Sequence, residues 1–279
     1  MFENIRSKPL AIMLTCAALF QSATVPAAPV AVRHTEGLVH GFLLLSTMEG
    51  KPLAHGDLIQ ISRGERVTNH LVFRFKDGSV RDETAVYSQR GIFRLLSYHL
   101  LQKGPTFPYP MEVSIDSSSG QVTVRYTDDG KEKVATERLQ LPPDLANGMI
   151  FTLLKNVRPD GPPTIVSMMA ATPKPRLVKI KINAQGEEPF SVGGAQRTAT
   201  HYVLKIEIGG VAGAIAPVVG KQPPDTHVWV LGGDAPAFVK SEGPIYYGGP
   251  NWRIELTSPV WARPVSEDSG KSKKPAPEK

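Results

Sequence analysis

The seven histidines are the side chains of this 279-residue sequence best suited to acid–base or metal chemistry. Both uses require partner residues at fixed spacing, as in the HExxH helix of zinc proteases. The sequence has no HExxH or HxH pair, so it predicts no local metal site and leaves open only a site assembled from distant strands. We expect solvated or core-edge positions for His34, His40, His55, His70, His99, His201 and His227.

The glycine-containing stretches do not meet the patterns that bind nucleotides. A phosphate loop needs G-x-x-x-x-G-K-[ST], but Ile215 replaces the first glycine and Gln222 follows Gly220-Lys221. The glycines between 209 and 213 are misplaced for a dinucleotide fold, and no serine elbow of the form G-x-S-x-G occurs. We therefore predict a non-catalytic protein that needs no cofactor and no metal.

Segment 209–220 is unusual because its twelve residues carry no charge. It is too short for the roughly 20 residues of a membrane-spanning helix, and Pro217 would disrupt one. A period-2 strand, "HYVLKIEI", runs directly into it. Three interpretations stay open: a buried strand with a turn, a wall of an apolar ligand cavity, or a tip that dips into a membrane.

Aromatic residues gather near the C-terminal end, between Trp229 and Trp261. Packing of the last hairpins explains most of them, although Tyr and Trp also suit a binding surface because each joins an apolar body to a polar tip. If the protein binds an apolar ligand, we expect the lining to comprise Met149, Ile150, Leu153, Ile215, Val218, Val219, Trp229, Tyr246 and Trp252.

Alternation of period 2 dominates the body of the chain. Met111, Val113 and Ile115 alternate with polar residues, a turn at 118–120 follows, and Asp129-Gly130 turns the chain again. Such alternation bounded by turn signals predicts antiparallel hairpins. We predict a mainly β protein with a curved antiparallel sheet of about eleven strands, within segments 41–51, 56–65, 69–79, 79–88, 111–116, 121–126, 176–183, 201–208, 227–233, 236–249 and 252–261.

One segment has the signals of a helix. Pro142-Pro143-Asp144 favours a helix start, apolar residues recur at spacings of four, and Pro159 forbids continuation. The pattern predicts a short helix over Asp144 to Val157 that is apolar on most sides and therefore buried inside the sheet. Gly148 is a poor helix former, which indicates close approach to another backbone.

The first 27 residues have the pattern of a secretory signal peptide. Arg6 and Lys8 precede an apolar run, Leu10 to Phe20, and a stretch of small residues follows. Cleavage after Ala27 is favoured over an uncleaved anchor, and over lipidation at Cys16. Because Cys16 is the only cysteine, the mature protein would have no disulfides and would depend on its hydrophobic core.

The positive charge is spread too thinly to indicate nucleic-acid binding. The formal net charge is +6, of which +1 lies in residues 1–27 and +2 in residues 262–279, leaving +3 for the body. Residues 262–279 lack apolar periodicity and are rich in Pro, Ser and Lys, so we expect a disordered basic tail. The tail either solubilises the protein or contacts an anionic membrane or wall.

The order of these elements resembles the half-barrel of periplasmic lipoprotein carriers and of related uncharacterised exported bacterial proteins. The resemblance covers about residues 32–261, taken as one β-rich domain, and "YGGPNWRIEL" resembles the GGPxW-like endings of some secreted proteins. It implies a curved sheet around a helix and an apolar cavity. Two functions follow: binding of a lipid-like or other apolar ligand, or an envelope scaffold with a filled core; a hydrolase is less favoured.

The signal pattern predicts a mature protein that begins near Ala28 and resides in the periplasm or outside the cell. N-terminal sequencing of the protein purified from its native host tests this directly. Retention of Met1 would contradict the prediction.

Overall fold

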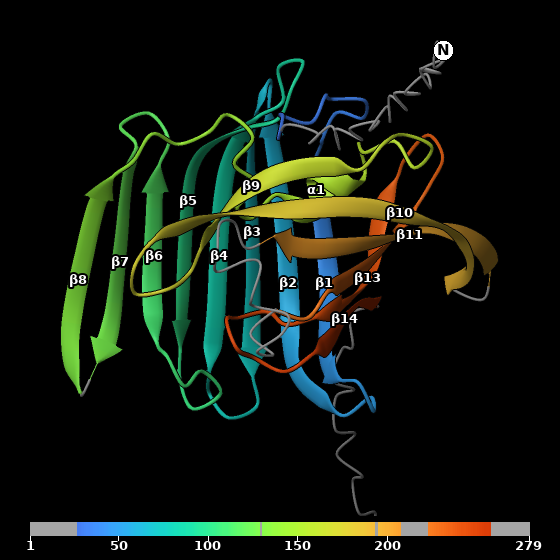
Figure 1. Ribbon diagram of the computed structural model, residues 1–279. Coiled ribbons are helices and arrows are strands. Elements are labelled where there is room, and N and C mark those ends of the chain that lie inside the picture. The colour runs from blue at the N-terminus through green and yellow to red at the C-terminus, as the bar shows by residue number, and fades with distance from the viewer. Residues whose placement is uncertain (1–26, 129, 193–194, 208–222, 258–279) are drawn as a thin grey trace, which may run out of the picture.

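Every strand in the described part of the chain belongs to one antiparallel sheet (Figure 1). The structure is a computed structural model that describes residues 27–128, 130–192, 195–207 and 223–257. The strands are β1 (Val39–Thr47), β2 (Pro52–Arg63), β3 (Arg66–Phe75), β4 (Val80–Ser88), β5 (Arg94–Lys103), β6 (Met111–Asp116), β7 (Gln121–Asp128), β8 (Lys131–Arg138), β9 (Thr164–Ala170), β10 (Arg176–Val192), β11 (Ala195–Glu207), β12 (Thr226–Leu231), β13 (Ala237–Gly243) and β14 (Trp252–Thr257).

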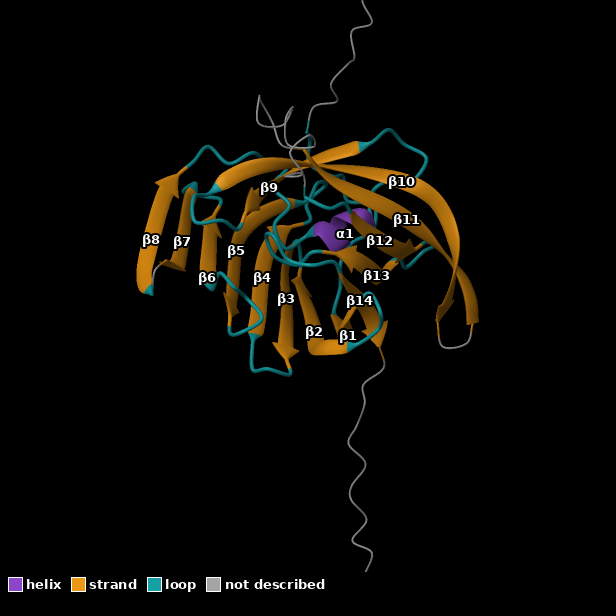
Figure 2. Ribbon diagram, turned by 60° about the horizontal axis from the view of Figure 1, so that its bottom comes forward, coloured by secondary structure: helices purple, strands orange, loops and turns teal. Residues whose placement is uncertain are grey.

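The strand order explains how the sheet encloses a core. It runs β8-β7-β6-β5-β4-β3-β2-β1-β14-β13-β12-β11-β10-β9, so nearly all neighbours are consecutive hairpins, and β1 joins the two halves by pairing with β14. Figure 2 shows the sheet curling into an arc around the only helix of the described residues, α1 (Ile150–Leu154). The predicted fold class, a mainly β protein with a curved antiparallel sheet around one short helix, is confirmed.

The sheet has fourteen strands, and the three beyond the predicted eleven lack a clean alternation. Strand β5, "RLLSYHLLQK", has apolar side chains on both faces, and β9, "TIVSMMA", reads as an apolar run. Strand β8, "KEKVATER", is almost entirely exposed and charged because it lies at an edge of the sheet. Burial on both faces, or on neither, removes the period-2 signal.

The predicted helix Asp144 to Val157 was too long, since α1 spans only Ile150–Leu154. Gly148 ends any earlier helix because its φ of +67° is left-handed. The close approach expected at Gly148 is to side chains rather than to backbone. A Cβ atom there would lie 2.7 Å from the Cβ of Ala85 and 3.2 Å from the ring of Tyr98.

Residues 144–147 run along the outer edge of β9 instead of forming a helix. Ala146 N donates to Ser167 O at 2.8 Å, and Ser167 N donates to Asp144 O at 3.2 Å. The amide of Asn147 both accepts from Met169 N at 2.8 Å and donates to Met169 O at 2.9 Å. These bonds satisfy backbone groups that an edge strand would otherwise leave unpaired.

A buried ion pair fastens the start of the described chain to α1. Lys155 Nζ lies 2.6 Å from Glu36 Oε2, and both side chains are almost fully buried. Gln60 Nε2 donates to the same carboxylate at 2.7 Å. Because loss of either charge would leave its partner buried and unpaired, this contact holds the N-terminal segment against the helix.

Parts of the chain named in the sequence predictions lie outside the described residues. They are the signal segment up to residue 26, the whole uncharged segment 209–220 within the gap 208–222, and the basic tail 262–279 within the gap from 258. The domain boundaries therefore stay predictions. Among the residues that are described, no helix has the length and apolar character needed to cross a bilayer.

Met149→Asp is expected to destabilise the protein by about 2–5 kcal/mol, because Met149 is 1% exposed and an unpaired carboxylate in the core is costly. The midpoint of urea unfolding measures the effect. Met48→Asp is the matched control, since Met48 is 37% exposed. Equal midpoints for the two variants would contradict burial of Met149.

Candidate functional site

A hollow of about 580 Å³ opens at the end of the sheet where β3 and β5 begin and β6 ends. One wall is made of strand ends and the opposite wall of the segment that follows β8. We call it the Arg66–Arg94 hollow. Its lining residues are Arg66, Arg94, Leu95, Leu96, Ser97, Asp116, Ser117, Ser118, Leu141, Pro142 and Pro143.

The direction of the strands brings the two arginines to this end. Arg66 is the first residue of β3 and Arg94 the first of β5, and both strands run antiparallel to the intervening β4. A bulge in β5 opposite Val86 and Tyr87 leaves Leu96 without a partner on β4. Such a bulge bends its strand, so the hollow forms where β5 departs from regular pleating.

The segment after β8 supplies the second wall and is held in place by backbone hydrogen bonds. Leu139 N donates to Gly120 O at 2.8 Å, and Leu145 N donates to Pro142 O at 3.3 Å. The two prolines between these bonds have fixed φ angles, which limits the freedom of the wall. These bonds and the two prolines hold the wall formed by the segment after β8 in place.

Of the charged groups at the hollow, the acid has hydrogen-bond partners and the two arginines have no ion-pair partner. Neither Arg66 nor Arg94 forms an ion pair with any residue that the structure describes, and both are exposed. Asp116 is already engaged by its own turn, where Ser118 Oγ donates at 2.7 Å and Ser119 Oγ at 2.9 Å. These hydrogen bonds lower the pKa of Asp116 to about 2, so its carboxylate stays ionised. Two free guanidinium groups thus remain available for an anion.

The rest of the lining is largely apolar. Leu95 is buried in the core, and Leu96, Leu141 and Pro142 are half-buried. Ser117 adds one polar feature, because its Oγ is buried and has no hydrogen-bond partner among the described residues. Apolar walls with a few converging polar groups are the usual character of a small-molecule site. The arrangement can bind a molecule that has both an apolar body and an anionic end.

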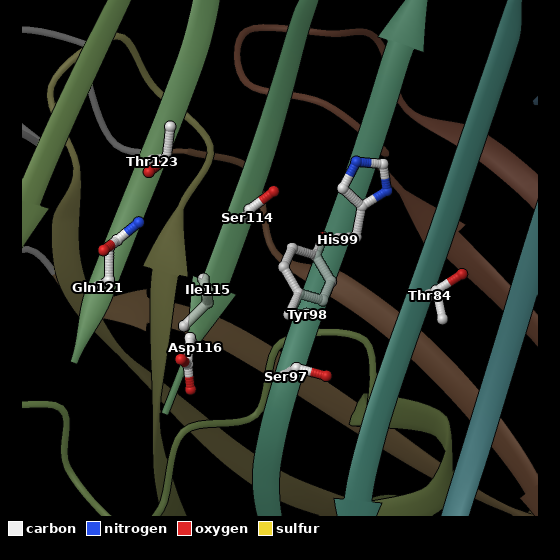
Figure 3. A pocket seen from close by; sticks show the side chains of 9 residues that line it. All are labelled: Thr84, Ser97, Tyr98, His99, Ser114, Ile115, Asp116, Gln121 and Thr123. Carbon is white, nitrogen blue, oxygen red and sulfur yellow. The ribbon is translucent and has the colours of Figure 1, made fainter. Parts of the chain in front are cut away.

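A second, smaller hollow of about 240 Å³ lies on the outer face of the sheet. Figure 3 shows Thr84, His99, Ser114 and Thr123 on neighbouring strands around it. These residues alternate with core residues such as Tyr98, so their side chains face away from the core. His99 Nε2 lies 2.9 Å from Glu112 Oε1. Most of its lining residues are polar, Tyr98 and Ile115 being the exceptions, and we assign it no ligand.

The residues predicted to line an apolar cavity do not lie together in the structure. Met149, Leu153 and Trp252 are buried in the main core, and Ile150 and Tyr246 pack against it. The rings of Tyr246 and Trp252 meet edge to face, with centroids 5.7 Å apart. None of these five lines either hollow. The other predicted residues are Ile215, Val218 and Val219, which lie outside the described chain, and Trp229.

Trp229 lies on the outer face, in a cluster that sequence reasoning did not find. Its ring stacks on His201 with centroids 4.4 Å apart, and Lys240 Nζ lies 3.7 Å from the centroid of the same ring. Trp229 Nε1 donates to Glu188 Oε2 at 2.7 Å, and His201 Nε2 lies 2.9 Å from His227 Nδ1. With both faces of the indole covered, Trp229 has no open face for a ligand.

Hydrogen bonding fixes where the protons of this cluster lie. His201 Nδ1 is 2.9 Å from Glu188 Oε1, and a carboxylate only accepts, so His201 donates from Nδ1. The neutral His201 then accepts at Nε2 from His227 Nδ1. Burial is the largest influence on His201 and lowers its pKa, with Glu188 opposing and His227 adding to the shift. The pairing of His201 with Trp229 on β12 creates the cluster, and no local spacing signals it.

The described residues contain no group of three or more His, Cys, Asp or Glu side chains arranged to hold a metal ion. His201 and His227 contact each other, and His201 also contacts the carboxylate of Glu188. We treat this cluster as a polar cover of the outer face and the Arg66–Arg94 hollow as the candidate site.

Comparison with known proteins finds a similar structure but no matching family. No family model matches the chain, and no curated protein matches it. Among solved structures, it is similar to a beta-barrel-like protein of a domain of unknown function from Brucella abortus, with a TM-score of 0.47 and 8% sequence identity. That match covers 82% of this chain and 100% of the other.

The lowered pKa of His201 predicts that the protein loses stability in mild acid. Its pKa in the folded state lies below the ordinary 6.5, so unfolding takes up a proton, and the free energy of unfolding falls as the pH drops below 6.5 toward the lowered pKa. His201→Gln should make this fall shallower, as measured by urea unfolding at several pH values. His55→Gln, at an exposed position, reports the effect of removing a histidine elsewhere. Equal slopes for His201→Gln and the wild type would contradict the prediction.

Proposed function

We propose that the protein is an exported, non-catalytic binding protein whose ligand is an amphiphile with an anionic headgroup, held in the Arg66–Arg94 hollow. The observation that carries this proposal is the pair of unpaired guanidinium groups beside apolar walls. An amphiphile matches both parts of this lining, because its charge would meet the arginines and its apolar portion the leucines and prolines.

The size of the hollow supports a small molecule. Ligand pockets usually enclose about 300–1,000 Å³, and this hollow of about 580 Å³ falls within that range. It is open on one side, so an acyl chain longer than the hollow could extend into solvent or into a membrane. We therefore expect the protein to engage the headgroup and the first part of the chain.

The arginines define the chemistry of the headgroup. A guanidinium group is always charged and presents a planar fork of donors that suits the two oxygens of a carboxylate or phosphate. The register places Arg66 and Arg94 on either side of Ser88 in β4, so their backbones lie about 10 Å apart and both long side chains could reach one anion between them. Asp116 adds a negative charge at the rim, which favours a compact anion directed toward the arginines.

The residues that line the hollow favour ligand binding over catalysis. Among the lining residues, the one titratable acid is Asp116, and its low pKa makes it a weak base at neutral pH. The lining has no histidine or lysine to activate a serine. Nothing in the hollow is arranged as a nucleophile and its base, so we infer that the ligand leaves unchanged.

A location in the cell envelope would expose the protein to ligands of this kind. The predicted signal peptide would deliver the protein to the periplasm or the exterior, where lipids and their breakdown products are the common anionic amphiphiles. The resemblance to lipoprotein-carrier half-barrels, which rests on element order, agrees with this assignment. A peripheral contact of the basic tail with an anionic surface would bring the hollow near its ligand. We propose no nucleic-acid partner.

The alternative is an envelope scaffold or interaction protein without a ligand. Its support is the filled interior, since Met149, Leu153 and Leu154 on and beside α1 are at most 2% exposed. A filled interior is compatible with both proposals, because the Arg66–Arg94 hollow lies at the end of the sheet. Ligand binding itself distinguishes them.

Replacing both arginines is expected to weaken binding of an anionic amphiphile strongly. We expect Arg66→Gln with Arg94→Gln to raise the dissociation constant of lauric acid at least about tenfold, since a hydrogen bond to a charged group contributes about 1.5–3 kcal/mol. Isothermal titration calorimetry measures this constant. Arg176→Gln is the matched control, because Arg176 is also exposed and unpaired but lies at the start of β10, outside the hollow.

Two further measurements decide between the proposals. Binding of the uncharged glycerol ester of the same acid should be weak and unchanged by the double variant. Native mass spectrometry of protein from its own envelope fraction should show a co-purified anionic lipid. A wild-type protein that carries no lipid and does not bind lauric acid would favour the scaffold.

A further inference from the structure

One edge strand of the sheet, β9, is covered by another segment of the chain, and the other edge strand, β8, is not. The outer edge of β9 is covered by residues 144–147, whereas β8 pairs only with β7. No described residue covers the other side of β8. An uncovered edge strand is a template for another strand, so the question is which strand fits it.

The backbone of β8 shows which of its groups are free. Leu139 N donates to Gly120 O on the β7 side, and N–H direction alternates along a strand. The backbone N–H and C=O groups of the odd-numbered residues of β8 therefore point toward β7. Those of the even-numbered residues point outward, away from the sheet. The outward set is Glu132, Val134, Thr136 and Arg138. A new antiparallel strand would pair with these four residues.

The charges of β8 are complementary to those of a second copy of β8. Along the strand they run Lys131, Glu132, Lys133, then Glu137, Arg138. When the strand is reversed and centred on Ala135, Glu132 faces Arg138 and Lys133 faces Glu137 of the other copy. Each pair occurs twice because of the twofold symmetry, and no like charges face each other. Cross-strand pairs of opposite charge stabilise a sheet, whereas like pairs destabilise it.

The hydrogen-bonding directions permit the same register. It places Glu132 opposite Arg138 and Val134 opposite Thr136, which joins outward-facing residues only. Val134 is 54% exposed in the single chain and would be covered by the partner. Moving the second strand by one residue would set outward-facing groups against inward-facing ones. A move by two that centres the pairing on Val134 would keep only Lys131 opposite Glu137, and a move by two the other way would keep no oppositely charged pair.

The existing ion pairs of β8 leave charges available for a partner. Lys133 contacts Asp128, and Glu132 lies 3.8 Å from Arg125, both as exposed pairs within the chain. Glu137 and Arg138 have no ion pair within the described chain. In the dimer, Lys133 of the second copy would face Glu137, and Glu132 of the second copy would face Arg138.

We propose that β8 joins two copies of this protein into a twofold-symmetric dimer, by antiparallel pairing centred on Ala135. The dimer continues the sheet from one copy into the next and uses the edge that the fold leaves uncovered. Such an interface is isologous, so each copy contributes the same strand. It is independent of the Arg66–Arg94 hollow.

Charge reversal tests the register. Sedimentation equilibrium of the full mature chain should show dimer that increases over roughly 1–500 μM, as expected for a small interface. Glu137→Lys places Lys opposite Lys133 twice, and Lys133→Glu places Glu opposite Glu137 twice. Each variant alone should dissociate at least tenfold more readily than the wild type. Mixing the two variants should restore a heterodimer, because every facing pair is again opposite in charge.

Proline substitution tests the backbone. Val134→Pro removes an outward N–H that the single chain does not use, so its unfolding midpoint should remain close to wild type while the dimer is lost. A wild-type protein that is monomeric throughout the concentration range would overturn the proposal. A dimer unaffected by both Glu137→Lys and Val134→Pro would also overturn it, because it would use another surface. Two repulsive variants that stay monomeric when mixed would exclude this register.

Discussion

The structure depends on how an unclosed antiparallel sheet fills its interior and protects an edge. Segment 139–157 accomplishes both within one short stretch. Residues 144–147 hydrogen-bond along β9, and Gly148 then reverses the chain so that Met149 and α1 enter the core. A side chain at Gly148 would meet Ala85 and Tyr98, so the reversal and the packing require the same residue. The buried pair Glu36–Lys155 adds the N-terminal segment to this arrangement.

The candidate site follows from the same constraint. The segment that fills the interior must first cross from the end of β8, and its prolines form one wall of the hollow. The other wall is formed by strand ends and by the bulge at Leu96, where regular pairing stops. Two arginines that begin β3 and β5 then lie beside apolar surface without acidic partners. A binding site at the end of the sheet is compatible with an interior that is already occupied by side chains.

The outer face carries most of the remaining polar chemistry. Strand alternation directs His70, His99 and His201 away from the core, and each lies within 2.9 Å of a carboxylate oxygen on a neighbouring strand. Only the cluster around His201 and Trp229 is tightly packed, because Lys240 and His201 cover both faces of the indole. The inner side is mainly apolar but also holds buried ion pairs, Glu36–Lys155 and Arg81–Glu83, the second of which accepts a hydrogen bond from Tyr98. Strand β8 lies at an edge of the sheet and has exposed charges on both faces.

The sequence by itself determined the antiparallel β class, most of the hairpins and the buried apolar segment around Met149, because these depend on local alternation, turn residues and apolar spacing. It did not reveal β5, β8 and β9, whose patterns depend on being buried on both faces or lying at an edge. It overextended α1, because Gly148 has a left-handed φ and packs closely against Ala85 and Tyr98, and these contacts with residues distant in the chain leave no local signal. Only the tertiary structure brought Arg66 to Arg94 and His201 to His227. These residues meet through strand order and register, which arise from pairing between distant segments and leave no local signal.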